Sequence, residues 1–264
     1  MKIARFSGPD GTVGFGVVDG VGPDGDVDGS ATITPILGHP YGVLEIAGPA
    51  LPLADVRLLA PVLPSKIVAV GKNYAAHAQE MGGEVPVEPM IFLKPSTAVI
   101  GPGDPIALPE QSERVEHEAE LAVVIGRLCS EVPVRRVPEV VLGYTCANDV
   151  TARDLQASDG QWGRAKGFDT FCPLGPWIET ELDPTSLSVR CRVNGDVRQD
   201  GTTADLVRGV DELVAWISNV MTLLPGDVIL TGTPAGVGPL VDGDTVSVSL
   251  SSIGTLTNRV VTRA

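Results

Sequence analysis

Glycine and proline interrupt this chain so often that it can form only short secondary-structure elements. The 31 glycines and 22 prolines are spread along all 264 residues and form no repeat. Because both residues mark turns, this spread favours many turns between short strands and argues against a bundle of long helices. The length still allows one large or two smaller domains with a substantial buried core.

Strand-like segments alternate with a few helical ones over most of the chain. The strand-like segments have the sequences ELAVVIG, VVLGYTCAND, SLSVRCRVNG, GDVILTGT and DTVSVSL. Helical patterns cover residues 73–81, 151–159 and 211–224, and the last has its apolar residues at helical spacing. Strands dominate, but the helices are regular, so the sequence predicts an α+β fold with a β-rich core.

The pattern changes near residue 60, which suggests two domains. Residues 1–60 hold short alternating segments separated by PDG and DG turns, as expected for a small β-rich N-terminal domain. A larger domain is predicted over residues 61–264, where the helical patterns lie.

The charge balance excludes several classes of partner. There are 19 Lys and Arg residues against 33 Asp and Glu residues, a net charge of −14, and such a surface repels nucleic acid and anionic lipid. No apolar run approaches the ~20 residues of a helical membrane span, and no secretion signal opens the chain. We therefore expect a cytoplasmic protein with no nucleic-acid or membrane partner. An anionic substrate would need local positive charge.

The segment VEHEAELAVVIG, residues 115–126, points most strongly to a functional site. Read as a strand, it places Glu116, Glu118 and Glu120 on one face. A solvated edge strand is the ordinary interpretation of such a pattern. Here, however, the strand continues into the apolar run LAVVI, which is typical of a buried element, and buried carboxylates need a cation.

Asp149 offers a further carboxylate, since it ends an apolar run just before a predicted helix. It could be a metal ligand, or it could lie in the N-cap region of that helix. An all-carboxylate ligand set suits hard cations, Mg²⁺ first and then Mn²⁺ or Ca²⁺, better than zinc.

Two pairs of polar residues stand three positions apart on predicted helices, so each pair can meet on one helical face. Arg153 and Gln156 could hold a substrate carboxylate beside a metal, or belong to an ordinary surface helix. His77 and Glu80 could form a surface pair. If their helix covers a metal site, they form a general base, with the flanking glycines letting the helix move as a lid.

The lysines and one glycine-rich segment complete the set of candidates. Of five lysines, Lys72, Lys94 and Lys166 stand beside glycine, proline or aromatic residues instead of on polar helical faces. The segment TGTPAGVGP, residues 231–239, lacks the ending of a phosphate-binding loop. A close backbone approach to a small ligand, with Thr231 or Thr233 pointing inward, is more plausible.

These segments match a known family in order. Over roughly residues 64–262 the chain resembles the fumarylacetoacetate hydrolase family, and its first 60 residues resemble the short N-terminal domain of many bacterial members. The matching strings are GKNYAAHAQEMGG, FLKP, VEHEAELAVVIG, ANDVTARDLQ, AKGFDTFCPLGPW, LLPGDVILTGTPAGVGP and IGTLTNRV.

The resemblance implies a fold of mixed sheets with a few helices, a homodimer and a site for Mg²⁺ or Mn²⁺. Glu116 falls outside the family's ligand set. The implied site residues are the metal ligands Glu118, Glu120 and Asp149, the catalytic residues His77, Glu80 and Lys166, and the substrate-binding residues Arg153, Gln156 and Thr233.

The resemblance also implies a metal-dependent enzyme acting on small anionic 2-oxo acids. Hydrolytic C–C cleavage of a 3-acylpyruvate is the leading hypothesis, because the His77–Glu80 pair could activate water. Oxaloacetate decarboxylation and isomerisation of 2-hydroxyhepta-2,4-diene-1,7-dioate in aromatic catabolism are alternatives. An oxo-acid binding protein without turnover is the non-enzymatic alternative. An acidic ligand of the larger eukaryotic hydrolase has no counterpart here, which argues against fumarylacetoacetate as the substrate.

Overall fold

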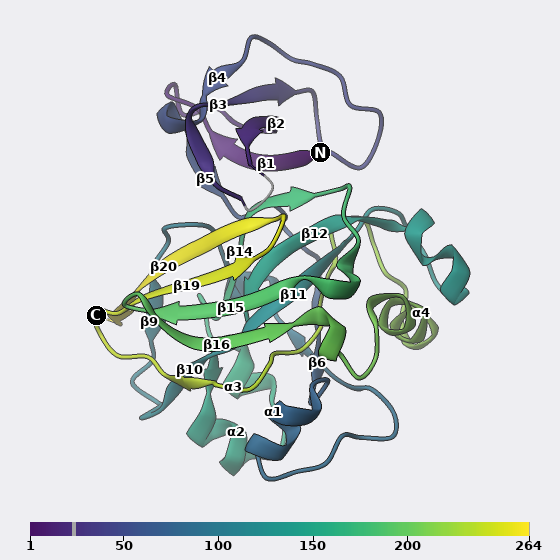
Figure 1. Ribbon diagram of the computed structural model, residues 1–264, viewed down its shortest axis with the longest axis vertical. Coiled ribbons are helices and arrows are strands. Elements are labelled where there is room, and N and C mark those ends of the chain that lie inside the picture. Colours follow the sequence, from purple (N-terminus) through teal and green to yellow (C-terminus); the bar gives the residue numbers. More distant parts are fainter. Residues whose placement is uncertain (23–24, 264) are drawn as a thin grey trace.

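Short strands dominate the structure, as the spread of glycine and proline predicts. The computed structural model describes residues 1–22 and 25–263. Within them the longest strand, β3 (Val27–Ile36), has ten residues and the longest helix, α4 (Val210–Val220), has eleven. The prediction of an α+β fold with a β-rich core is confirmed (Figure 1).

A twelve-stranded sheet runs through the whole molecule. Its further strands are β1 (Lys2–Ser7), β2 (Val13–Val21), β4 (Leu51–Pro52), β5 (Arg57–Leu59), β6 (Ile67–Gly71), β7 (Met90–Lys94), β8 (Val99–Ile100), β11 (Ala119–Ile125), β12 (Val141–Asn148), β14 (Cys172–Glu179) and β17 (Val228–Leu230). The order is β4-β3-β2-β1-β14-β12-β11-β17-β6-β7, with β5 paired to β1 and β8 paired to β14.

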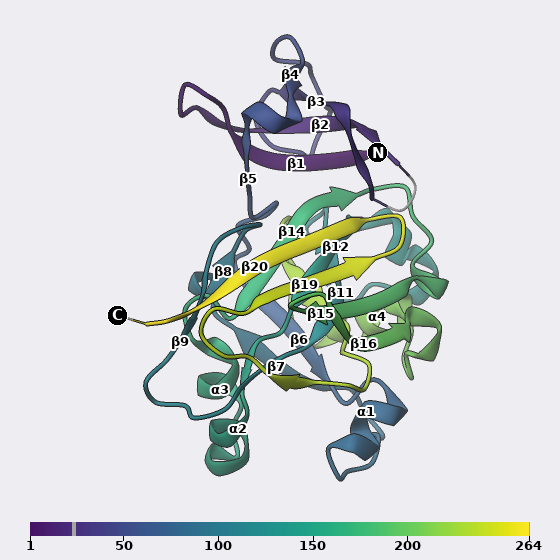
Figure 2. The ribbon, with the colours of Figure 1, turned by 60° about the vertical axis from the view of Figure 1, so that its left-hand side comes forward.

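Two smaller sheets are built entirely from strands that follow residue 60. The strands of a five-stranded sheet are, in spatial order, β16 (Asp196–Thr202), β15 (Ser188–Val193), β19 (Thr245–Leu250), β20 (Gly254–Thr262) and β9 (Ile106–Leu108). This sheet packs on β11, β12 and β14 of the large sheet (Figure 2). A three-stranded sheet has the order β13 (Thr151–Ala152), β10 (Val115–His117) and β18 (Gly238–Pro239).

Helices are few and short. Besides α4, the described residues contain α1 (Ala75–Glu80), α2 (Arg153–Asp159) and α3 (Gly163–Gly167). Short 3₁₀ segments cover Leu53–Asp55, Ser96–Ala98, Val134–Glu139, Pro184–Ser186 and Thr203–Asp205. Figures 1 and 2 show α1, α2 and α3 at the end of the molecule remote from the N-terminal strands. Within the described residues, every helix falls short of the length and hydrophobicity that crossing a bilayer requires.

All three predicted helices are shorter in the structure than in the sequence pattern. The helix predicted over residues 73–81 spans Ala75–Glu80, because Tyr74 before it pairs with Leu206 instead. The helix predicted over residues 151–159 begins at Arg153, because the two residues before it pair with β10. The helix predicted to reach Leu224 ends at Val220. There the chain turns away so that the backbone of Leu223 can pair with that of Cys129.

Strand β11 divides its side chains between two apolar clusters. Leu121, Val123 and Ile125 join a cluster that includes residues of the five-stranded sheet, while Ala122 and Val124 point to the opposite side. All seven residues of the strand are buried, because both of its faces are covered. The positions just before this strand therefore enter the interior as well.

The N-terminal strands form a lobe that continues the large sheet. Strand β1 pairs with β14 through two residue pairs, Lys2 with Glu179 and Ile3 with Ile178. Glu179 is buried and accepts hydrogen bonds from the Lys2 amine at 2.8 Å and the amino group of Met1 at 2.6 Å. Burial opposes ionisation of this carboxyl, but these two donors hold the pKa of Glu179 below its usual range.

We expect Glu179→Gln to lower the free energy of unfolding by about 1–3 kcal/mol near pH 7. Because the folded-state pKa of Glu179 is depressed, its contribution is present above the unfolded-chain value of about 4.3 and is lost as the pH falls through the folded-state value. The deficit of the variant should therefore shrink in acid. Denaturant titrations at neutral and acidic pH measure it, with the exposed Glu181→Gln as the control. An equal deficit at both pH values would contradict the assignment.

Candidate functional site

The strand pairing of β11 with β12 brings three carboxylates together. Glu118 joins β10 to β11, and Glu120 lies two residues further on. Asp149 follows β12, and its backbone N–H donates to the carbonyl of Glu118 at 2.9 Å. Each of the three residues is buried and offers one carboxylate oxygen, and these oxygens lie within 4.8 Å of one another. The structure thus unites the three predicted metal ligands.

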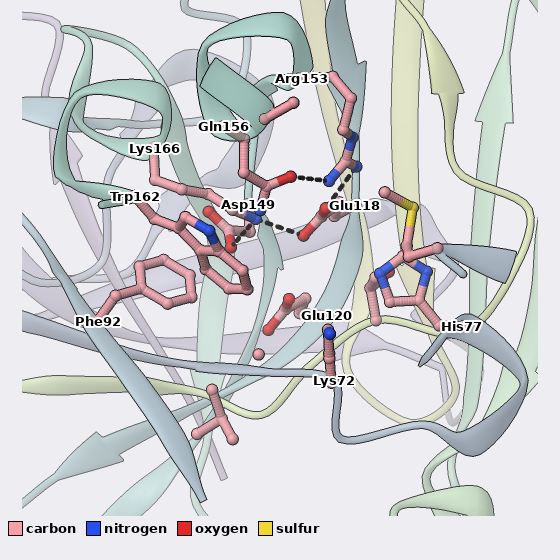
Figure 3. A pocket seen from close by; sticks show the side chains of 15 residues that line it. Lys72, His77, Phe92, Glu118, Glu120, Asp149, Arg153, Gln156, Trp162 and Lys166 are labelled. Atoms are coloured by element: carbon pink, nitrogen blue, oxygen red, sulfur yellow. Dashed lines mark hydrogen bonds and ion pairs between the residues drawn. The ribbon is translucent and has the colours of Figure 1, made fainter. Parts of the chain in front are cut away.

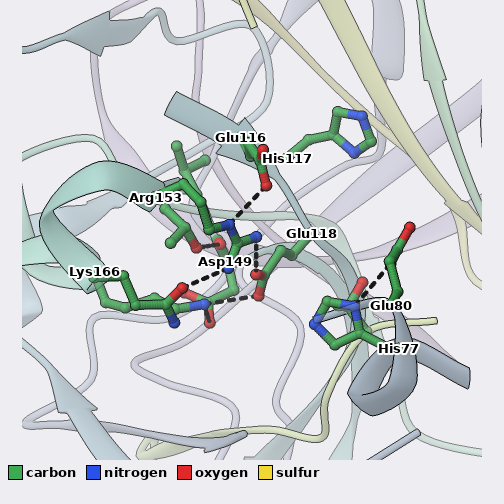
Figure 4. A network of polar contacts seen from close by, with 12 residues as sticks. His77, Glu80, Glu116, His117, Glu118, Asp149, Arg153 and Lys166 are labelled. Carbon is green, nitrogen blue, oxygen red and sulfur yellow. Dashed lines mark hydrogen bonds and ion pairs between the residues drawn. The ribbon is translucent and has the colours of Figure 1, made fainter. Parts of the chain in front are cut away.

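Cationic side chains neutralise Glu118 and Asp149. The Lys166 amine lies 2.7 Å from a carboxylate oxygen of each, and Arg153 donates to Glu118 at 2.6 Å (Figure 4). Lys94 donates to the other oxygen of Asp149 at 2.5 Å. Burial opposes ionisation of Glu118, yet the charges of Lys166 and Arg153 hold its pKa well below its usual range. Glu118 is therefore ionised.

Lys166 is held in its charged form by the same contacts. Burial favours the neutral amine, but the carboxylates of Asp149 and Glu118 raise the pKa of Lys166 above its ordinary value. The ammonium also lies 5.2 Å from the centre of the Phe92 ring. Lys166 therefore serves this pocket as a fixed positive charge.

Glu120 is the carboxylate whose charge is left uncompensated. It accepts a hydrogen bond from the backbone N–H of Gly232 at 2.7 Å, and among the described residues no cationic side chain forms an ion pair with it. Burial, and then the charges of Asp149 and Glu118, raise the pKa of Glu120 well above its ordinary value. A divalent cation between the three carboxylates would supply the missing positive charge. The residues fit Mg²⁺ or Mn²⁺, since all the donors are oxygens.

Glu116 has a different function from the one the strand pattern alone suggests. It faces the same side as Glu118, but it is not part of the three-carboxylate group. Its two oxygens accept hydrogen bonds from Arg153 at 2.6 Å and Arg114 at 2.7 Å. Glu116 therefore fixes Arg153 and lies outside the three-carboxylate group.

A cavity of about 280 Å³ opens beside the carboxylates (Figure 3). Eight of the nine predicted site residues line it, all except Glu80. The full lining consists of Val70, Gly71, Lys72, His77, Met81, Phe92, Glu118, Glu120, Asp149, Arg153, Gln156, Ala157, Trp162, Lys166 and Thr233.

His77 and Glu80 meet on α1, as their spacing predicts. The His77 Nδ1 lies 3.1 Å from a carboxylate oxygen of Glu80, and Figure 4 shows the imidazole between Glu80 and Glu118. Glu80 also accepts a hydrogen bond from the backbone N–H of Gly236 at 3.0 Å. The ring is buried and faces the cavity, so the interpretation as a simple surface pair is wrong.

Arg153 and Gln156 share one face of α2, also as predicted. Arg153 donates to the Gln156 side-chain oxygen at 2.6 Å, and both side chains reach the cavity. The alternative role considered for Asp149, capping this helix, is wrong. The N-cap position is Ala152, and no side chain caps the helix there.

The backbone of the glycine-rich segment, residues 231–239, binds carboxylates of this protein, where the sequence predicted an approach to a small ligand. Gly232 and Gly236 have φ values of 103° and 100°, and their N–H groups donate to Glu120 and Glu80. Thr233 lines the cavity, but its hydroxyl donates to the Ala119 carbonyl at 2.8 Å. The hydroxyl of Thr233 thus ties the loop to β11, and its role toward a substrate stays a prediction.

Sequence reasoning missed Gln199, which joins this loop to the acidic strand. Gln199 is fully buried, and its oxygen accepts from the Ala119 N–H at 3.0 Å and lies 3.0 Å from His117 Nδ1. Its amide donates to the Thr233 hydroxyl at 2.7 Å and the Pro234 carbonyl at 2.8 Å. No sequence signal marks this residue, because only the packing of β16 against the loop brings it there. Lys94 was noticeable only by its position beside a proline.

The fold and the site define a β-rich enzyme with a candidate metal centre of three buried carboxylates. Residues 66–261 match the fumarylacetoacetate (FAA) hydrolase C-terminal family, and residues 1–61 match the Rv2993c-like N-terminal family. The chain therefore belongs to the fumarylacetoacetate hydrolase family.

Relatives of known name or structure resemble most of the chain. Protein Rv2993c of Mycobacterium tuberculosis is 56% identical over 99% of this chain and 98% of its own length. A solved structure of 5-carboxymethyl-2-hydroxymuconate delta-isomerase from Mycobacterium smegmatis is 57% identical, covers 100% of both chains and has a TM-score of 0.91. The mitochondrial oxaloacetate tautomerase FAHD2A of Homo sapiens is 45% identical over 81% of this chain and 72% of its own length.

We expect Glu120→Gln to remove metal binding without destabilising the metal-free protein. The amide keeps the shape of the side chain and removes repulsion from Glu118 and Asp149, so in EDTA the variant should melt at or above the wild-type temperature. Mg²⁺ or Mn²⁺ at 100 times its dissociation constant should stabilise the wild type by about 2.7 kcal/mol and the variant by far less. Thermal melts with EDTA and with each cation measure this.

The exposed Glu139→Gln is the matched control for that experiment, because it removes a carboxylate that is not part of the cavity lining. It should respond to the cations as the wild type does. Equal metal stabilisation of the Glu120→Gln variant and the wild type would show that the cation binds elsewhere.

Proposed function

We propose that this protein is a divalent-metal-dependent enzyme that moves a proton at C3 of a small 2-oxo acid, by keto–enol tautomerisation or double-bond isomerisation. One observation supports this most directly: a buried imidazole, fixed by Glu80, lines the same cavity as the three carboxylates. A base beside a carboxylate-lined metal site is the minimum that such a proton transfer needs.

The cation would act as a Lewis acid that polarises the 2-oxo group and so acidifies the protons at C3. His77 then takes or returns the proton. Glu80 is placed to accept a hydrogen bond from Nδ1–H, which would leave Nε2 as the atom that takes the proton. Arg153 and Lys166 place fixed positive charge beside the substrate's carboxylate, against the net charge of −14 on the chain.

The names of two relatives support this chemistry. One is called a tautomerase acting on oxaloacetate and the other a delta-isomerase, and both names describe isomerisation. We extend this class of reaction to the present chain. The native partner would then be a small anionic 2-oxo acid. The choice between Mg²⁺ and Mn²⁺ and the expected homodimer stay predictions.

Hydrolysis of a 3-acylpyruvate is a second candidate, favoured by the same His77–Glu80 pair. If a water molecule occupies the cavity, the imidazole can take a proton from it instead of from carbon. The assay below therefore follows both outcomes, together with decarboxylation of oxaloacetate.

We expect EDTA-sensitive conversion of enol to keto oxaloacetate, faster than pyruvate release from oxaloacetate or acetylpyruvate. His77→Ala should lower kcat/KM by a factor of about 10²–10⁴, because it removes the base, while stabilisation by Mg²⁺ or Mn²⁺ stays as in the wild type. The decay of enol absorbance and coupled pyruvate detection measure the three rates after subtraction of the metal-only rates.

His39→Ala is the matched control, since His39 is exposed on the N-terminal lobe and should leave all rates unchanged. Pyruvate release from acetylpyruvate as the fastest reaction would favour the hydrolase. Full tautomerase activity in His77→Ala would refute the role given to the imidazole.

A further inference from the structure

Lys72 occupies a position in the cavity that the proposed proton transfer does not use. It follows β6 directly, and its backbone φ is 57°, in the left-handed region that disfavours a long side chain. Glycine or asparagine would fit this backbone with less strain. Retained strain of this kind, at a residue that lines a cavity, points to a role for the side chain.

The Lys72 amine is also free of the contacts that hold the other cations of the cavity. Arg153 and Lys166 are both bound to Glu118. Within the described residues, the amine of Lys72 forms neither an ion pair nor a hydrogen bond, and the side chain is half-buried. Its positive charge therefore remains available to a ligand.

The amine is held at the edge of the cavity by its packing on Gly83. A Cβ atom at Gly83 would lie 2.6 Å from the Lys72 Nζ, so the absence of a side chain there makes room for the ammonium. Figure 3 shows Lys72 on the side of the cavity formed by β6 and α1, whereas Arg153 and Gln156 enter from α2. The cavity thus has positive charge on two sides.

We propose that Lys72 binds a second carboxylate of the substrate, at the end remote from the 2-oxo group, and so selects dicarboxylic over monocarboxylic 2-oxo acids. The inference rests on the proposed function, which places the 2-oxo acid end beside the three carboxylates, Arg153 and Lys166. A molecule small enough for about 280 Å³ that spans both sides then brings its far end to Lys72. An ammonium with no partner among the residues that the structure describes is a strong donor for a carboxylate in such a cavity.

Two ligands of equal length test this assignment. 2-Oxopentanedioate and 2-oxopentanoate share the 2-oxo acid end and differ only in a terminal carboxylate against a methyl group. Their affinities are measured by isothermal titration in Mg²⁺, for the wild-type protein, Lys72→Asn and Lys72→Arg. Asparagine tolerates the left-handed backbone, so Lys72→Asn should melt no lower than the wild type.

We expect the wild type to bind the dioate at least about tenfold more tightly than the monocarboxylate. Lys72→Asn should weaken dioate binding by about tenfold to a hundredfold and leave binding of 2-oxopentanoate within about twofold of wild type. Lys72→Arg, which keeps the positive charge, should retain most of the preference for the dioate. Arg164→Asn is the matched control. Arg164 is an exposed cation on α3, paired with Asp159 and outside the cavity lining, so its loss should not change the preference.

Equal affinities of the wild type for both ligands, or a preference that survives in Lys72→Asn, would overturn the assignment and leave the proposed function standing. Parallel weakening of both ligands in Lys72→Asn would overturn it too, because it would show a structural role. If neither ligand binds the wild type in Mg²⁺, the proposed function itself fails, and the inference fails with it.

Discussion

The burial of several carboxylates in one place is the constraint on which the rest of the structure depends. Glu118, Glu120 and Asp149 are nearly inaccessible to solvent, and like charges at this spacing strongly oppose one another. The fold reduces this repulsion by placing Lys94 and Lys166 beside Asp149, and Arg153 beside Glu118. Glu120 remains without a cation among the described side chains. The site is therefore arranged around a positive charge that the side chains themselves do not supply.

Strand β11 explains how such a costly cluster can be built. Its apolar residues bury both faces of the strand, and this burial carries Glu120, within the strand, and Glu118, just before it, into the interior. The antiparallel partner β12 ends beside the same point and delivers Asp149. The free energy that offsets the cost of the carboxylates comes from the apolar clusters that flank them.

Local sequence patterns could predict the cluster of acidic side chains but not the residues that hold it in place. The period of two and the apolar run that follows indicate that Glu118 and Glu120 point together into the interior, and spacing alone pairs His77 with Glu80. The contacts of Lys94 with Asp149 and of Gln199 with Ala119 join residues 55 and 80 positions apart in the chain. Such contacts depend on how the sheets pack against each other, so they cannot be predicted from a local sequence pattern. Helix ends were misjudged for a similar reason, because the pairing of Leu223 with Cys129 competes with helical hydrogen bonds.

The glycine-rich loop, residues 231–239, links the three buried carboxylates to the His77–Glu80 pair. Its Gly232 N–H holds Glu120, and its Gly236 N–H holds Glu80, which in turn orients His77. Both N–H groups can face these carboxylates because the backbone takes positive φ values, and a side chain would clash: a Cβ at Gly236 would lie 2.2 Å from the carbonyl oxygen of Arg198. Gln199 also fixes the loop, because its side-chain amide donates hydrogen bonds to Thr233 and Pro234. A displacement of the loop would therefore disturb Glu120 and the His77–Glu80 pair together, so this one segment fixes the relative geometry of the two halves of the site.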